Sequence, residues 1–206
     1  MNELLAGAAG QQMSLVDYLA DFDRHFWRMD SLGFWKLERQ QFFREPGYDT
    51  WEAFNRGDWD ESLRLLDAGR AELAAEHRRI AAHGLPVRRV RVVEEPLTAY
   101  LQWELQVLRV REQYGTGIRI VRPEQVAPWE PSGPVPEICT LGSAVLYEAV
   151  YDPDGVLESA IRYDDPALVQ RCQRLIAHLY AEGEPLRGYF ARRVAPLSAP
   201  VGHRSG

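Results

Sequence analysis

The spacing of apolar residues separates helical from extended segments of the chain. Between residues 15 and 26, apolar side chains recur every three or four positions, and Ser14 with Asp17 resembles a helix-capping box. Asp58 and Asp165 stand at two further helix starts, where a short polar side chain can accept a hydrogen bond from the first turn. The pattern predicts helices over about 14–27, 59–83, 96–113 and 166–182.

Extended segments alternate with these helices. The run 87–93 is rich in β-branched residues, and 118–121 forms a second such run after one intervening helix. A strand, a helix and a strand within about 35 residues form a βαβ unit, so we expect parallel strands with a right-handed crossover. The sequence Asp-Pro-Asp-Gly at 152–155 is a strong turn signal and predicts a hairpin with strands over about 143–151 and 156–163.

These elements predict an α/β (α+β) fold. Its small mixed four-stranded sheet would combine the βαβ unit with the hairpin, and the helices would cover it. We expect one globular domain over 14–190, in which 14–58 is an aromatic-rich helical N-terminal arm and 59–190 is the α/β core. Residues 1–13 are predicted to be a flexible leader and 191–206 a flexible tail.

The arm has an unusual density of rings. Ten of the 22 aromatic residues fall between positions 26 and 59, where helical periodicity is lost and glycine and proline interrupt the chain. One interpretation is that the rings anchor an irregular segment to the core. The other is that they form a partner-binding surface, because amphipathic rings also dominate interfaces. The candidate partner-binding residues are Trp35, Phe42, Phe43 and Trp51.

Charge and cysteine content exclude some classes of protein. A net charge of −6 argues against direct binding to nucleic acid, which relies on a basic surface. Lys36 is the only lysine among 24 basic residues, a bias typical of a GC-rich genome. Cys139 and Cys172 have no metal-ligand spacing, so we expect two buried thiols and no metal. No signal peptide or long apolar run is evident, which predicts a cytoplasmic protein with no membrane contact.

Familiar catalytic motifs are absent. The sequence contains no phosphate-binding glycine loop, no dinucleotide fingerprint, no hydrolase elbow and no zinc-protease motif. We therefore expect no cofactor and favour a protein that is not an enzyme.

The best-motivated ligand site lies where the parallel strands end. Ligands of open α/β sheets bind beyond the carboxyl ends of the strands, and arginines there can hold a phosphate or carboxylate. The alternative is that these arginines are the solvent-facing half of alternating strands. The candidate ligand-binding residues are Arg88, Glu94, Glu95, Thr98, Arg119 and Arg122.

One acidic residue interrupts the leucine stripe of the helix predicted over 96–113. Glu104 could be a buried acid with a raised pKa. More often such a residue extends its carboxylate to solvent or pairs with an arginine, for which Arg88 or Arg119 would serve.

Several segments together resemble an actinobacterial, streptomycete-type family of uncharacterised proteins, domain of unknown function 6879. The resemblance covers most of residues 15–190 and transfers no catalytic residue. It implies a regulatory context, because members occur near genes for helix-turn-helix regulators. The segments that carry it are 26–32, 87–105, 118–121, 151–157 and 164–169.

The predicted arrangement is also similar to domains of the phospholipase D type. Their catalytic H-x-K-x-x-x-x-D motif is missing here, because Lys36 has no histidine two residues before it. If the architecture is related, its chemistry has been lost.

Two hypotheses about function follow. The first is a non-catalytic binding or regulatory module with a protein partner such as a helix-turn-helix regulator, which predicts an exposed apolar patch on the arm. The alternative is an enzyme or sensor that binds an anionic small molecule, which predicts a concave pocket with convergent arginines and an acid of perturbed pKa.

Overall fold

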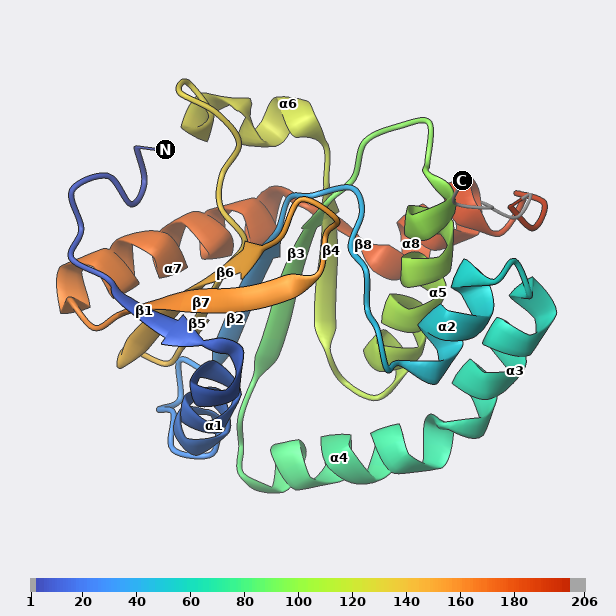
Figure 1. Ribbon diagram of the computed structural model, residues 1–206, viewed down its shortest axis with the longest axis horizontal. Coiled ribbons are helices and arrows are strands. Elements are labelled where there is room, and N and C mark those ends of the chain that lie inside the picture. The colour runs from blue at the N-terminus through green and yellow to red at the C-terminus, as the bar shows by residue number, and fades with distance from the viewer. Residues whose placement is uncertain (1–2, 201–206) are drawn as a thin grey trace.

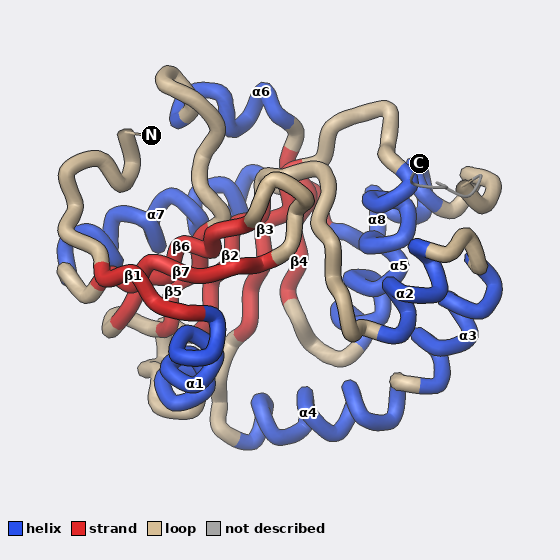
Figure 2. The backbone as a smooth tube through the Cα atoms, in the orientation of Figure 1, coloured by secondary structure: helices blue, strands red, loops and turns tan. Residues whose placement is uncertain are grey.

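The computed structural model describes residues 3–200 and contains one mixed sheet with helices on both faces (Figures 1 and 2). The order of strands across the sheet is β1-β7-β6-β5-β2-β3-β4-β8. The strands are β1 (Gln11–Ser14), β2 (Phe34–Glu38), β3 (Val87–Val92), β4 (Gly117–Val121), β5 (Ile138–Leu141), β6 (Val145–Tyr151), β7 (Leu157–Tyr163) and β8 (Glu184–Pro185).

The helices account for most of the remaining chain. Short 3₁₀ and π-helical turns, η1 (Ala127–Trp129) and η2 (Phe190–Val194), follow two of them. The helices are α1 (Leu15–Phe26), α2 (Asp49–Asn55), α3 (Trp59–Ala68), α4 (Arg70–Ala82), α5 (Ala99–Gln113), α6 (Pro123–Val126), α7 (Pro166–Glu182) and α8 (Leu186–Tyr189).

The βαβ unit and the hairpin are confirmed. Strands β3 and β4 run parallel, with Arg89 opposite Ile118 and Val92 opposite Val121, and α5 connects them. Strands β6 and β7 pair antiparallel around the turn at 152–155. In that turn Asp152 Oδ1 accepts hydrogen bonds from the backbone of the next few residues, as expected for an aspartate at a turn start.

The predicted four-stranded sheet is wrong in its number of strands, because the sheet has eight. The short strand β2 lies in the aromatic segment that we expected to be an irregular arm, and it occupies the centre of the sheet between β5 and β3. Its pattern, Phe-Trp-Lys-Leu-Glu, is too short to predict a strand on its own. Burial between two neighbouring strands therefore decides its conformation.

Two predicted helix boundaries are also wrong. The helix expected over 59–83 is two helices, α3 and α4, that meet at Gly69. The helix expected from residue 96 begins at Ala99, because the Thr98 hydroxyl accepts the hydrogen bond of the Leu101 N–H and so caps α5.

The ends of the described chain are also structured. Residues 11–14, partly in the segment predicted as a leader, form β1 at the edge of the sheet against β7. Residues 190–194, near the start of the predicted tail, form η2, and residues 201–206 of that tail lie outside the described residues.

Different helices cover the two faces of the sheet. Helix α7 crosses one face and contacts β2 through β6, burying Leu37, Val90 and Ile176. On the other face α1 packs at the β5-β6-β7 end and α5 at the β4 end, each with its own apolar cluster (Figure 1). The centre of that face, over β2 and β3, is left between the two helices.

Candidate functional site

Charged side chains occupy the centre of the sheet on the face that α1 and α5 share. Because side chains alternate along a strand, Lys36 and Glu38 of β2 point away from α7, whereas Leu37 packs beneath it. The parallel register sets Lys36 beside Arg89 and Glu38 beside Arg91. These four residues, which we call the charged centre, therefore come together through strand pairing alone.

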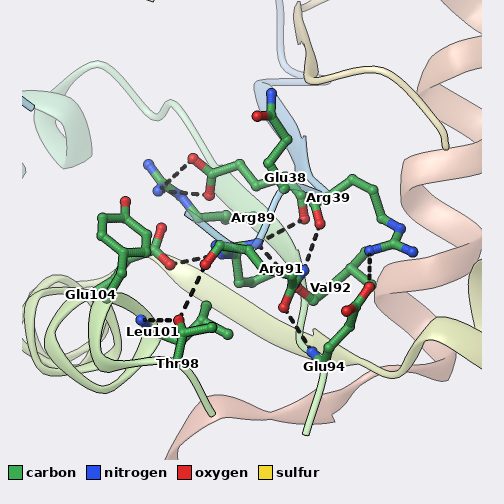
Figure 3. A network of polar contacts seen from close by, with 12 residues as sticks. Glu38, Arg39, Arg89, Arg91, Val92, Glu94, Thr98, Leu101 and Glu104 are labelled. Carbon is green, nitrogen blue, oxygen red and sulfur yellow. Dashed lines mark hydrogen bonds and ion pairs between the residues drawn. The ribbon is translucent and has the colours of Figure 1, made fainter. Parts of the chain in front are cut away.

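The Glu38 carboxylate forms ion pairs with two cations of the charged centre, Lys36 and Arg89. The Lys36 Nζ lies 2.7 Å from Glu38 Oε1, and Arg89 Nη1 donates to both carboxylate oxygens, at 2.9 and 3.1 Å (Figure 3). Burial pushes the pKa of Glu38 upwards, but the charges of Arg89 and Lys36 outweigh it and lower that pKa to about 2. Glu38 is consequently an anion across the physiological range.

Arg91 and Glu104 form a second, fully buried ion pair. Arg91 Nε donates to Glu104 Oε2 at 2.8 Å, and both side chains are almost inaccessible to solvent (Figure 3). Burial raises the pKa of Glu104, and Arg91 opposes that rise. Of the alternatives left open by the sequence, Glu104 is a buried acid and also pairs with an arginine. Its partner is Arg91, because Arg88 and Arg119 point to the opposite face of the sheet.

A cavity of about 410 Å³ opens above the charged centre, within the usual range of small-molecule sites. Lys36, Glu38 and Arg89 form part of its floor, while α5 and the segment 43–48 supply much of its wall. The lining also contains several aromatic rings. Its rings are those of Phe43, Tyr48, Tyr100, Trp103 and Tyr151.

The lining carries more cations than anions. Arg44 and Arg111 add to Lys36 and Arg89. Within residues 3–200, the guanidinium of Arg111 has neither an ion-pair nor a hydrogen-bond partner. Of the acids, Glu104 is already neutralised by a buried arginine.

The third acid of the lining, Glu45, is held by a hydrogen bond within the wall. Burial raises its pKa, although its Oε1 accepts a 2.9 Å hydrogen bond from the Tyr100 hydroxyl. The cavity as a whole is therefore suited to receive an anion.

The strand-end residues predicted as a ligand site separate into two groups. Glu94, Glu95 and Arg122 border a surface concavity of about 720 Å³, where they are held by exposed ion pairs with Arg39, Arg193 and Glu124, respectively. The other three lie elsewhere. Arg88 stacks on Trp35 and Arg119 on Tyr180, both on the α7 side, and Thr98 caps α5.

The candidate partner-binding rings are mostly internal. Phe43 and Trp51 are 4% and 2% exposed and belong to an apolar cluster with Trp103. Trp35 is half-buried and packs against the α7 cluster, and only Phe42 of the four is well exposed, at 46%. The structure thus favours the interpretation in which the rings anchor the segment to the core.

The residues of the charged centre were not predicted as a site, although their alternation along β2 and β3 can be read from the sequence. In β3 the sequence Val-Arg-Arg-Val-Arg-Val places two arginines on one face, and in β2 Lys36 and Glu38 alternate with apolar neighbours. We expected such charged positions to face solvent. Helices on both flanks instead bury Arg91 completely and leave Arg89 only 19% exposed.

Other chemistry is limited in the described part of the chain. Cys139 and Cys172 are free, buried thiols, as expected, and belong to the apolar clusters on opposite faces of the sheet. Residues 3–200 contain no group of three metal-ligating side chains. No helix in the same range is long and apolar enough to cross a membrane.

Comparison with known families places most of the chain in one of them. A family described as a domain of unknown function (DUF6879) matches residues 20–191, a segment that runs from α1 to η2 and includes the whole charged centre. No curated protein matches the chain.

Proposed function

The chain belongs to the DUF6879 family, a domain of unknown function, and we propose that it is a non-catalytic module that binds a small organic anion. The ligand occupies the cavity above the charged centre. Its acidic group lies against Lys36 and Arg89, and Arg111 closes the approach from α5.

The observation that carries this proposal is the surplus of cations in a partly apolar cavity. Lys36 and Arg89 share a single carboxylate, and their side chains are 25% and 19% exposed, so an incoming anion meets them with little water between. Electrostatic attraction is stronger in such a site than at the open surface. The strand-end concavity fits less well, because its charges are exposed and already paired.

A regulatory role with a protein partner stays a hypothesis. Phe42 is the ring that supports it, since this side chain is exposed beside the hairpin turn. Binding of an anion beneath the same segment is compatible with such a role.

The test measures anion binding to the intact chain. A panel of small carboxylates and phosphate esters is screened by thermal shift, and the compounds that raise the melting temperature are titrated by calorimetry. We expect Arg111→Gln and Lys36→Met to weaken binding at least about tenfold, since each removes a charge-assisted contact. Arg88→Gln is the matched control, because Arg88 lies next to Arg89 but on the α7 face of the sheet.

Two results would overturn the proposal. One is that no member of the panel binds. The other is that Arg111→Gln and Lys36→Met bind as tightly as the unmodified chain.

A further inference from the structure

The lining of the cavity combines charged side chains with aromatic rings. Lys36 and Arg89 lie on the floor, and the rings of Tyr48, Tyr100 and Trp103 lie in the wall that α5 and the segment 43–48 build. A ligand that contacts both kinds of side chain carries an anionic group and a ring on the same small molecule.

Contacts behind the wall hold its rings in place. Trp103 Nε1 donates to the hydroxyls of Thr50 and Ser62, both at 3.0 Å. Phe54 stacks on the far side of Trp103, with centroids 5.5 Å apart and planes inclined by 15°. Tyr48 meets the same indole edge-on, at 6.1 Å. A wall fixed in this way loses little conformational entropy when a ligand binds.

We propose that the ligand is an aromatic acid, with a carboxylate or phosphate bound by Lys36 and Arg89 and its ring packed on the partly exposed ring of Tyr48. This inference rests on the proposed function and names the class of anion. Aromatic pairs gain energy beyond the area that they bury, which an aliphatic chain of equal size does not. The positive charge of the floor and Arg111 selects for the acidic group.

The experiment compares probes that share a charge and differ in the ring. Phenyl phosphate, cyclohexyl phosphate and inorganic phosphate are titrated calorimetrically into the full chain, and benzoate and acetate form a second series. We expect phenyl phosphate to bind roughly tenfold more tightly than cyclohexyl phosphate, and inorganic phosphate to bind most weakly. The series with the tighter aromatic member identifies the acidic group.

A pair of variants tests the place of the ring. Tyr48→Leu removes a ring from the cavity, whereas Trp59→Leu removes a ring from the same aromatic cluster that neither lines the cavity nor stacks on Trp103. We expect only Tyr48→Leu to abolish the preference for phenyl over cyclohexyl phosphate. If both phosphate esters bind equally to the unmodified chain, the aromatic inference is wrong and anion binding stands; if no probe in either series binds, both fail.

Discussion

The buried pair Arg91–Glu104 gives the sharpest test of the internal electrostatics. The two side chains are 0% and 6% exposed and joined at 2.8 Å. Glu104→Gln keeps the shape and one acceptor oxygen but removes the negative charge. The guanidinium then loses its closest anionic partner, and its hydrogen-bond acceptors are the new amide oxygen and the backbone carbonyls of Val92 and Glu38.

The magnitude follows from the burial of both partners. Removing one member of a buried ion pair costs about 3–5 kcal/mol, and we expect Glu104→Gln at the lower end because the amide still accepts a hydrogen bond. We expect Arg91→Met to cost less, because burial raises the pKa of Glu104 and loss of the opposing cation favours its neutral form further. The double variant Arg91→Met/Glu104→Leu is expected to cost much less than the sum of the single variants.

Urea unfolding at pH 7, followed by tryptophan fluorescence and circular dichroism, measures these free energies. Glu61→Gln serves as a control, because Glu61 pairs with Arg64 on an exposed helix face and its loss should lie within experimental error. The reasoning is refuted if Glu104→Gln costs less than about 1 kcal/mol, or if the two single variants are additive.

Three further predictions concern other parts of the fold. The pKa of Glu38 falls from about 4.5 to about 2 on folding, so ionised Glu38 contributes about 3 kcal/mol to the free energy of unfolding above pH 4.5, and this contribution is lost as the pH falls through 2. Glu38→Gln should therefore flatten the dependence of urea stability on pH in that interval, and parallel profiles for the two proteins would contradict this. Gly33→Ala should lower the free energy of unfolding by about 1–3 kcal/mol more than Gly84→Ala does. Both glycines have positive φ, but of the two only Gly33 would place a Cβ 2.3 Å from a backbone carbonyl oxygen, and equal melting temperatures of the two variants would count against this. Tyr147→Phe should lower the free energy of unfolding by about 2 kcal/mol and raise the pKa of Asp21, because the Asp21 carboxylate accepts a 2.6 Å hydrogen bond from the buried tyrosine hydroxyl. An unchanged titration of the Asp21 carboxyl group by NMR would show that this hydrogen bond is unimportant.

Local patterns predicted the elements whose stability is mainly local or that carry a long periodic signal. Helix α7 begins after Asp165 and spans the predicted residues 166–182, and β3 with β4 forms the expected parallel pair around α5. Strand β2 escaped prediction because an alternation of apolar and charged residues over five positions is too short to predict a strand. Without β2, neither Lys36 nor Glu38 could be placed.

The candidate site shows the same division between local and tertiary information. The sequence singled out Glu104 as an acid within a leucine stripe and showed that arginines alternate along β3, because both features are visible within one element. Which arginine meets Glu104 depends on the side of the sheet that α5 covers. The sequence also suggested a site at the strand ends, yet the described structure gathers only half of those residues there.

By itself, then, the sequence determined the alternation of helices and strands, the parallel βαβ unit, the hairpin and the buried state of both cysteines. These features follow from side-chain periodicity, capping and turn residues, which act over a few positions. Only the tertiary structure decided that the charged faces of β2 and β3 look into a cavity and not into solvent. The physical reason is that a strand fixes which residues share a face, whereas the helices packed beside that face fix whether water reaches it.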